Sequence, residues 1–155
     1  MPFWDELKGS MDDKDWAILR IVQADARKTY AEIGRMVKLS PPATAERLRR
    51  LEDAGVIVGY HANLDVAKLG LKMLTFIEMT VKKVDYPRFK DAITRHNWIL
   101  ECHHIAGDGS FILKAAVPDV LGLERLIEHL GQFGETKTSL VMSTTLGRRE
   151  FPARK

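Results

Sequence analysis

The chain has 155 residues, of which 45% are hydrophobic and 29% charged, and its formal net charge at pH 7 is +3. This composition is typical of a soluble globular protein with one ordinary domain or two small ones. No apolar run approaches the ~18 residues of a membrane-spanning helix, and no signal-peptide pattern opens the chain. The single cysteine, Cys102, excludes an intrachain disulfide. A reducing cytoplasm is therefore the expected location, and no membrane partner is predicted.

Charge is unevenly distributed over the first 60 residues. This part carries ten Lys/Arg and ten Asp/Glu, but residues 27–50 hold seven basic side chains against two acidic ones. A basic patch on an otherwise neutral domain attracts polyanions. Nucleic acid is therefore the first partner to consider.

The chain opens with two predicted helices behind a short tail. Residues 1–11 lack periodicity and are expected to form an N-terminal tail. Residues 12–24 are expected to form a helix, because aspartates stand at the start, where the helix dipole is positive, and apolar residues follow at helical spacing. Residues 29–37 are expected to form a second helix, since Thr29 and Glu32 have the spacing of a capping box.

The stretch from Ser40 to Gly55 carries the strongest local pattern. Ser40 is a good N-cap, Pro41 follows where a helix tolerates proline, and Gly55 is expected to end the helix in a left-handed conformation. Two short helices joined by a tight turn, the second of them basic, predict a helix-turn-helix over residues 12–60. A plain three-helix bundle is the alternative. The arginines that lie off the apolar stripe are Arg47, Arg49 and Arg50.

A linker over residues 61–70 is predicted to separate this domain from a second one. Residues 56–64 are β-rich and predict a wing or an inter-domain strand, and residues 148–155 form a basic tail. In residues 71–147, strands and helices alternate as β-α-β-β-α-β, the split βαβ arrangement of an α+β fold. The expected elements are strand 72–83, helix 85–96, strands 97–106 and 111–117, helix 119–130 and strand 136–146.

A sheet of this arrangement has helices on one face only. Its other face must be covered, and a second copy of the chain is the obvious cover. The sequence therefore predicts a homodimer.

Four segments resemble the Lrp/AsnC family, the leucine-responsive or feast/famine transcription regulators, and the resemblance spans residues 12–147. It implies an N-terminal DNA-binding domain and a C-terminal ferredoxin-like domain that dimerises, with dimers assembling into tetramers or octamers. It also implies a small effector, often an amino acid, bound between dimers. The segments are Leu39-Ser40-Pro41 with Glu46-Arg47-Leu48-Arg49-Arg50-Leu51-Glu52 and Gly55-Val56-Ile57, Glu101-Cys102-His103 with Gly107-Asp108, Val117-Pro118-Asp119, and Thr136-Lys137-Thr138.

The predicted contacts with double-stranded DNA lie at the entry and on the outer face of the third helix. The first turn of this helix lacks hydrogen-bonding side chains, so direct base readout is expected from Arg47 or Glu46, with loose specificity that depends on DNA bending. Arg50 has an alternative, a pair within the helix with Glu46 or Asp53. The full predicted set is Arg35, Lys38, Ser40, Pro42, Ala43, Glu46, Arg47, Arg49 and Arg50.

The predicted effector site centres on the turn from Gly107 to Phe111. Its glycines expose backbone N–H groups that suit a carboxylate, and Asp108 suits an ammonium group; threonine hydroxyls on the last strand are implied by the resemblance. Many family members carry an acidic residue and then tyrosine where this chain has Ser110 and Phe111, so one ammonium acceptor is missing. An ordinary hairpin turn without ligand is the alternative. The full set is Gly107, Asp108, Gly109, Ser110, Thr136 and Thr138.

The sequence also bears on functions other than DNA binding. Cys102, His103 and His104 lack a second Cys/His cluster at zinc spacing, so no metal site is predicted. No phosphate loop, nucleophile motif or pair of catalytic carboxylates appears, so neither enzymatic activity nor a cofactor is predicted. The alternatives are a sirohaem-decarboxylase-like enzyme, which shares this two-domain layout, and a ligand-sensing module with vestigial DNA binding.

Overall fold

The computed structural model describes residues 11–147 and 149–151, and the chain divides into two compact units. The first unit comprises residues up to Ala62 together with the C-terminal residues from Leu146, and the second is Asn63–Thr145. Of the two expected tails, 1–11 and 148–155, only Met11 and residues 149–151 fall within the described residues. None of the helices in the described part of the chain is long and apolar enough to cross a membrane.

Three helices build the first unit, and side-chain caps explain where each begins. Asp12 and Asp15 form a capping box at the first helix, as Thr29 and Glu32 do at the second, so each pair satisfies two backbone N–H groups. Ser40 caps the third helix by accepting the N–H of the residue three positions on at 3.4 Å. The helices are α2 (Asp13–Ala24), α3 (Tyr30–Val37) and α4 (Pro41–Asp53).

Their apolar faces share one small core. Between α3 and α4 the chain turns at Lys38, whose φ of 57° lies in the left-handed region. A Cβ at Gly34 would lie 2.6 Å from the carbonyl oxygen of Leu39 and 2.9 Å from Oγ1 of Thr44, so only glycine allows the two helices to approach this closely. The helix-turn-helix is confirmed. The buried apolar members are Ile18, Leu19, Ile33, Val37, Leu48 and Leu51.

The segment after α4 is irregular. Gly55 has a φ of 68° and ends the helix as expected. The N–H groups of Val56 and Ile57 then donate back to the carbonyl oxygen of Leu51, at 2.9 and 3.1 Å, instead of to a neighbouring strand. The wing or inter-domain strand expected over 56–64 is therefore wrong, since these residues form no strand.

The C-terminal residues of the first unit contact α2. The backbone N–H of Phe151 donates to Oε1 of Gln23 at 2.8 Å, and Nε2 of Gln23 donates to the carbonyl oxygen of Phe151 at 3.4 Å. One glutamine side chain thus satisfies both backbone groups of a residue 128 positions away in sequence.

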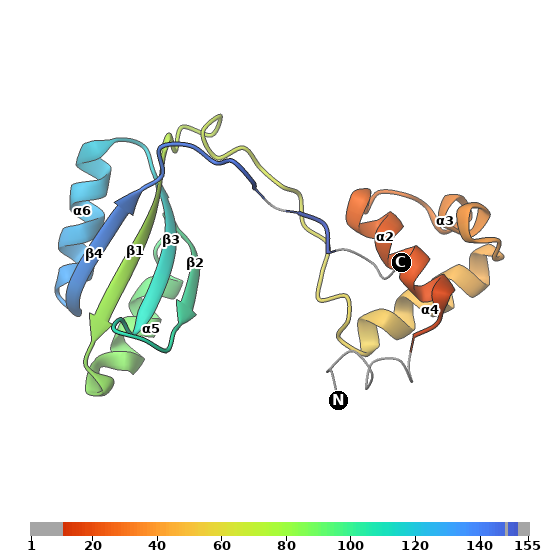
Figure 1. Ribbon diagram of the computed structural model, residues 1–155, viewed down its shortest axis with the longest axis horizontal. Coiled ribbons are helices and arrows are strands. Elements are labelled where there is room, and N and C mark those ends of the chain that lie inside the picture. The colour runs from red at the N-terminus through yellow and green to blue at the C-terminus, as the bar shows by residue number, and fades with distance from the viewer. Residues whose placement is uncertain (1–10, 148, 152–155) are drawn as a thin grey trace. The chain divides into compact units, whose positions relative to one another are not determined.

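The second unit is a four-stranded antiparallel sheet with two helices on one face (Figure 1). The strand order is β2-β3-β1-β4, and the chain order β-α-β-β-α-β is confirmed, although three strands are shorter than expected. The elements are β1 (Met73–Val81), η1 (Lys83–Asp85), α5 (Tyr86–Thr94), β2 (Ile99–His104), β3 (Phe111–Val117), α6 (Val120–Gly131) and β4 (Gly134–Leu140).

Side chains of the sheet alternate between a face covered by the helices and an open one. On the covered face, Ile77 and Met79 of β1 pack with Leu113 of β3 against the two helices. On the opposite face Phe76 is 40% exposed, and its neighbour across the strands is Lys114. We call this second surface the open sheet face, formed by Phe76, Glu78, Glu101, His103, Ile112 and Lys114.

Candidate nucleic-acid interface and ligand site

The start of α4 and the turn before it are exposed together. Ser40 and Pro42 are exposed, and Ala43 is half-buried beside them. Arg35 at the end of α3 and Lys38 in the turn are exposed on the same stretch. Pro41 and Pro42 carry no backbone N–H, so this helix start offers an anion the positive end of the helix dipole, the Ser40 hydroxyl and the two flanking cations. This arrangement suits a phosphate backbone.

Arg49 lies one turn further along α4 and pairs with Glu46 within the helix. The two side chains are 67% and 66% exposed. An ion pair this exposed contributes little to stability, because water and salt screen it. Breaking this pair so that Arg49 binds another anion would therefore cost little free energy.

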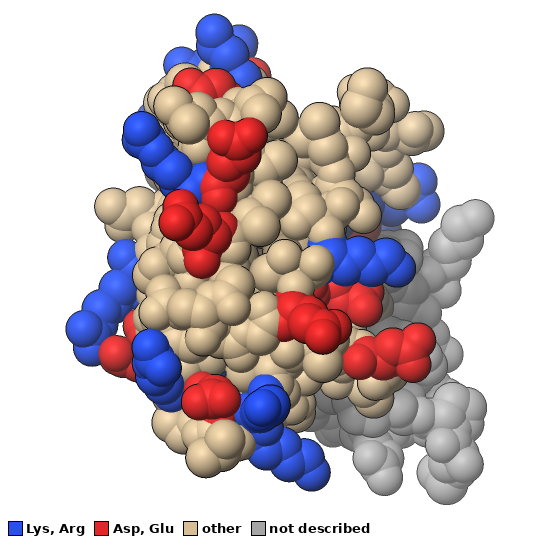
Figure 2. All heavy atoms as spheres, turned by 90° about the vertical axis from the view of Figure 1, so that its left-hand side faces the viewer, with Lys and Arg blue, Asp and Glu red and all other residues tan. Residues whose placement is uncertain are grey.

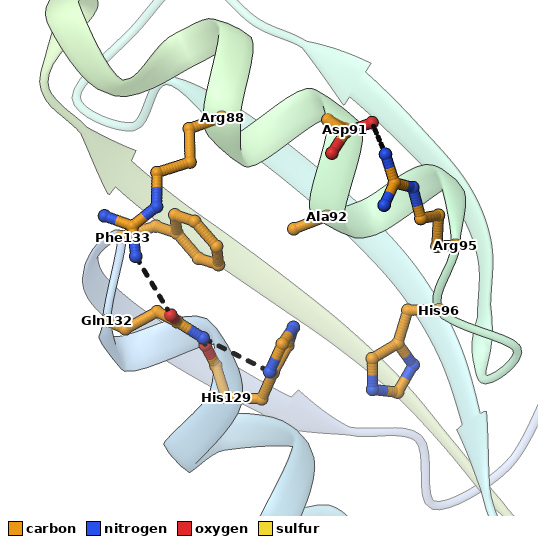
Figure 3. A pocket seen from close by; sticks show the side chains of 8 residues that line it. All are labelled: Arg88, Asp91, Ala92, Arg95, His96, His129, Gln132 and Phe133. Atoms are coloured by element: carbon orange, nitrogen blue, oxygen red, sulfur yellow. Dashed lines mark hydrogen bonds and ion pairs between the residues drawn. The ribbon is translucent and has the colours of Figure 1, made fainter.

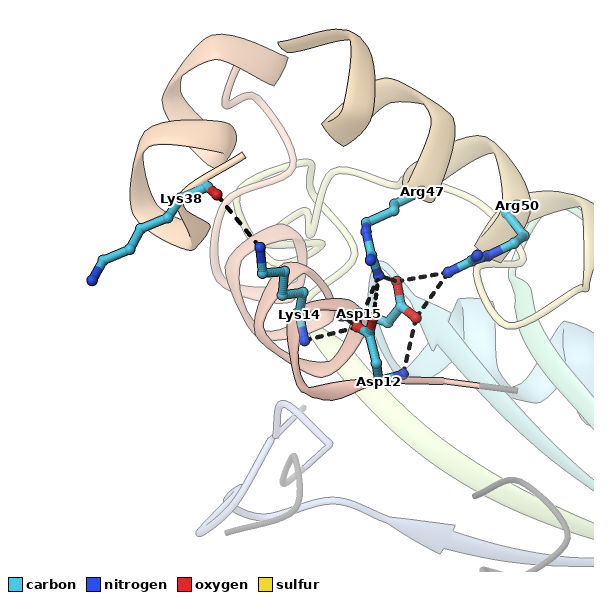
Figure 4. A network of polar contacts seen from close by, with 6 residues as sticks. All are labelled: Asp12, Lys14, Asp15, Lys38, Arg47 and Arg50. Carbon is cyan, nitrogen blue, oxygen red and sulfur yellow. Dashed lines mark hydrogen bonds and ion pairs between the residues drawn. The ribbon is translucent and has the colours of Figure 1, made fainter. Parts of the chain in front are cut away.

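The other two arginines of α4 point toward the start of α2 (Figure 4). Nη1 of Arg47 donates to both carboxylate oxygens of Asp12, at 2.8 and 2.7 Å, and to Oδ1 of Asp15 at 2.8 Å. Nη2 of Arg50 donates to both oxygens of Asp15, at 3.2 and 3.0 Å. Arg50 thus pairs with Asp15 rather than with Glu46 or Asp53. We call these four residues the Asp–Arg network.

Burial differs among the members of the Asp–Arg network. The side chain of Asp15 is 1% exposed, that of Arg47 23% and that of Arg50 57%. The N–H of Asp15, and then the Arg47 guanidinium, hold the pKa of the Asp12 carboxyl below its usual value. Hydrogen bonds that Arg47 donates to Asp12 and then to Asp15 raise the pKa of Arg47. Base readout by Arg47 would therefore require its guanidinium to leave two carboxylates.

The first unit carries the concentrated positive charge that a polyanion needs. Figure 2 views the second unit from the side of α6, where Lys/Arg and Asp/Glu side chains are mixed across the surface. A mixed surface produces little net field. By contrast, residues 27–50 of the first unit hold seven basic and two acidic side chains. Even with Arg47 and Arg50 paired to the aspartates of α2, the basic side chains remain in excess. The electrostatics favour the first unit as the nucleic-acid interface.

The turn between β2 and β3, the predicted ligand site, is tied to the end of β1. Oγ of Ser110 accepts the N–H of Val81 and donates to its carbonyl oxygen, both at 3.1 Å. The hydroxyl is therefore already bonded within the fold. A Cβ at Gly109 would lie 2.7 Å from Cγ of Glu78, so the side chain of Glu78 packs directly over the turn. This carboxylate was missed from the sequence, since β1 is 30 residues upstream.

The remaining predicted ligand residues are divided between surfaces. Gly107 and Asp108 are exposed in the turn. Thr136 pairs with Met79 and Thr138 with Ile77 in the antiparallel register. Because cross-strand partners share a face, both threonines lie on the helix-covered face, opposite Glu78.

The histidines and the cysteine of β2 follow the strand alternation. Cys102 and His104 lie on the helix-covered face, where His104 contacts Phe111, and His103 lies on the other. Burial raises the pKa of the Cys102 thiol. Among residues 11–147 and 149–151, no group of three or more His, Cys, Asp or Glu side chains is placed to hold a metal ion.

Comparisons with known proteins match both units. The sequence model described as the AsnC-type helix-turn-helix domain matches residues 11–52, and that described as the Lrp/AsnC ligand binding domain matches residues 74–151. The HTH-type transcriptional regulator LrpC of Bacillus subtilis is 36% identical over 133 residues, or 86% of this chain and 92% of LrpC. The leucine-responsive regulatory protein of Escherichia coli is 34% identical over 139 residues, or 85% of each chain.

Solved structures agree with the sequence matches. The structure of Bacillus subtilis LrpC superposes with a TM-score of 0.85 at 34% identity, covering 90% of this chain and 99% of that one. The transcriptional regulator NMB0573 of Neisseria meningitidis, solved as a complex with L-Met, gives a TM-score of 0.85 at 26% identity over 92% and 97% of the two chains.

Proposed function

The chain belongs to the Lrp/AsnC family of transcriptional regulators, and from this premise we propose that it contacts double-stranded DNA with the start of α4 and the turn before it. As a member of the family it is a DNA-binding regulator whose second unit is a ligand-binding domain. The relatives named above are regulators, which disfavours the sirohaem-decarboxylase-like alternative.

The proposal is carried by the exposure of the capped start of α4 between cations that lack buried partners. The hydroxyl of Ser40 donates to phosphate beside Arg35 and Lys38, while the small side chains enter the groove and make apolar contacts. Glu46, once released from Arg49, is the remaining candidate for base readout. The proposed contact set is Arg35, Lys38, Ser40, Pro42, Ala43, Glu46, Arg49 and, through the exposed side of its guanidinium, Arg50.

Arg47 and Arg50 have a different role in this proposal. Their carboxylate partners lie at the start of α2, so they hold α4 at a fixed position on the rest of the unit. Arg50, which is 57% exposed, also reaches phosphate with the part of its guanidinium that faces solvent. Arg47 acts on DNA through the placement of α4 rather than by contact.

DNA binding as a function of salt tests this division. We expect Lys38→Ala and Arg49→Ala each to lower the slope of log affinity against log salt by about 1, with folding unchanged. Arg20→Ala, which removes an exposed cation from α2, is the matched control and should leave the slope unchanged. The interface is refuted if the slope is unchanged in both interface variants, or if the Arg20→Ala control lowers the slope by the same amount. Absence of salt-dependent DNA binding by the unaltered chain would instead support the vestigial-binding alternative.

We further propose that an amino acid effector binds at the turn between β2 and β3. Backbone N–H groups of Gly107 and Gly109 suit its carboxylate, and Asp108 with Glu78 suits its ammonium group. The carboxylate of Glu78, which lies beside the turn, supplies the ammonium acceptor that the chain lacks at Ser110. The complex of NMB0573 with L-Met supports an amino acid as the class of ligand. Thr136 and Thr138, which face the helices, are outside this proposed site.

Isothermal titration with the twenty amino acids tests the effector site. We expect one or a few to bind, and Glu78→Gln and Asp108→Asn each to weaken binding about tenfold, the loss of one charged hydrogen bond. Glu124→Gln, at an exposed carboxylate of α6, is the matched control. If both variants bind the amino acid as tightly as the unaltered chain, the effector site lies elsewhere. If no amino acid binds, the result supports the alternative of an ordinary hairpin turn without ligand.

Assembly and location complete the proposal. A second copy of the chain covers the open sheet face, and such dimers associate further into tetramers or octamers. The protein works in the cytoplasm, beside the DNA it regulates.

A further inference from the structure

A cleft of about 410 Å³ opens between α5 and α6 in the second unit (Figure 3). Its volume falls within the ~300–1,000 Å³ of small-molecule sites. The turn between β2 and β3 contributes nothing to its lining. The proposed effector site therefore does not account for it. Most of the lining side chains carry hydrogen-bond donors: Arg88, Arg95, His96, His129 and Gln132.

Arg88 is held at one wall of the cleft by two neighbours. Its Nη2 donates to Oε1 of Gln132 at 3.3 Å, and its guanidinium lies over the ring of Phe133, 5.2 Å from the centroid. No carboxylate in the described part of the chain pairs with Arg88. A guanidinium held in place without an acidic partner is a preorganised donor for an oxyanion.

Two imidazoles stand next to each other on the other side of the cleft. The ring centroids of His96 and His129 are 5.3 Å apart. Nδ1 of His96 accepts the N–H of Trp98 at 3.4 Å, and Nδ1 of His129 lies 3.2 Å from Nε2 of Gln132. When Nδ1 accepts, the proton of a neutral imidazole sits on Nε2. These two contacts therefore leave Nε2 as the nitrogen of each ring that can donate to a ligand.

The charge around the cleft favours an anion. Asp91 is the one carboxylate in the lining, and it pairs with Arg95. Arg88 remains as uncompensated positive charge. Burial, and then the neighbouring His129, hold the pKa of His96 below its usual value. A bound oxyanion accepts hydrogen bonds from these rings whether or not they are protonated.

We propose that this cleft binds the oxyanion of a small metabolite, a phosphate or carboxylate group, between the guanidinium of Arg88 and the imidazoles of His96 and His129. The site is independent of the effector turn, so the failure of one proposal leaves the other standing.

Histidine NMR of the full chain tests the proposal, with inorganic phosphate and acetate as separate probes at constant pH and ionic strength. Saturable shifts confined to the Cε1–H signals of His96 and His129 are expected, with His61, His103 and His104 unmoved. Response to phosphate alone identifies a phosphate group, response to acetate alone a carboxylate, and response to both an oxyanion in general. No saturable shift with either probe, or equal movement of all five histidines, overturns the proposal.

Substitutions locate the site. Arg88→Gln is expected to weaken binding about tenfold, through the loss of a charged hydrogen bond. Arg88→Lys should weaken it less, because lysine keeps the positive charge but lacks the paired N–H donors of a guanidinium. Lys90→Gln removes an exposed cation two residues away on α5 and is the matched control. Equal affinity in the Arg88→Gln and Lys90→Gln proteins contradicts the assignment, provided both keep the amide spectrum of the unaltered fold.

Discussion

Arg47 and Asp15 are 32 residues apart in sequence, yet Nη1 of the arginine lies 2.8 Å from Oδ1 of an aspartate whose side chain is 1% exposed. Through this contact the acidic start of α2 holds the basic helix of the helix-turn-helix. The same aspartate receives Arg50 and the N–H of Asp12. One buried carboxylate therefore joins two arginines of α4 to the first turn of α2.

Asp15→Ala is expected to destabilise the first unit by about 2–3 kcal/mol. Hydrogen bonds to charged groups each contribute about 1.5–3 kcal/mol, and Arg47 keeps Asp12 while Arg50 turns to solvent. Urea denaturation followed by circular dichroism measures the loss. The matched control, Asp13→Ala, removes an exposed aspartate of the same turn and should change stability by about 0.5 kcal/mol or less. Equal losses in the two variants would show that the network adds nothing beyond helix-dipole effects.

The stability of the first unit should depend on acid pH through Asp12. Its folded-state pKa is lowered, first by the N–H of Asp15 and then by Arg47. A lowered folded pKa means that the carboxylate stabilises the fold above about pH 4 and loses this effect as pH falls through the folded value. Asp12→Asn keeps the N-cap but not the charge. Its stability should lie below that of the unaltered chain at pH 7 and converge with it in acid; parallel curves would contradict the prediction.

Gly34→Ala should destabilise the helix-turn-helix by about 1–3 kcal/mol, as overpacking does. Elsewhere in a helix this change stabilises by up to about 1 kcal/mol. Here the new Cβ would lie 2.6 Å from a backbone oxygen, that of Leu39. Gly131→Ala in α6 is the control, since nothing lies within 4 Å of a Cβ there, and it should be neutral or stabilising. The midpoint of thermal unfolding distinguishes the two variants. A Gly34→Ala protein more stable than the unaltered chain would refute the close approach of α3 to the backbone of Leu39.

Phe76→Glu should separate the proposed dimer. Phe76 is 40% exposed on the open sheet face. A glutamate buried there by the partner would compete with Glu101 for Lys114 and leave one carboxylate unpaired. Light scattering should then report the mass of one chain, 17.6 kDa. Val120→Glu changes an apolar residue of α6 that is 60% exposed and serves as the control. An unchanged mass for Phe76→Glu would place the interface between copies elsewhere.

Local chemistry explains why much of the fold could be predicted. The caps at Ser40 and Thr29 act over three residues, so the sequence alone indicated where α3 and α4 begin. The strand expected over 56–64 failed because β-branched side chains favour a strand only where a partner strand accepts the backbone. Here Val56 and Ile57 donate to Leu51 instead.

The candidate sites were less accessible to prediction than the fold. Charge alone gave no way to assign Arg47 to Asp15, because their contact depends on how α2 packs across α4. Glu78 was missed for the same reason, since only strand pairing brings β1 beside Gly109. Ser110 belongs to the predicted ligand set, but its hydroxyl already accepts from and donates to the backbone at the end of β1.

The bonds between Gln23 and the backbone of Phe151 bear on how this protein can be dissected. The first unit is discontinuous in sequence, because the chain leaves it after Ala62 and returns at Leu146. A DNA-binding fragment that stops at Ala62 would lack the residues around Phe151 that Gln23 contacts. A single polypeptide with a circularly permuted order, joining residue 151 to the start of the helices, would be the natural way to isolate that unit intact.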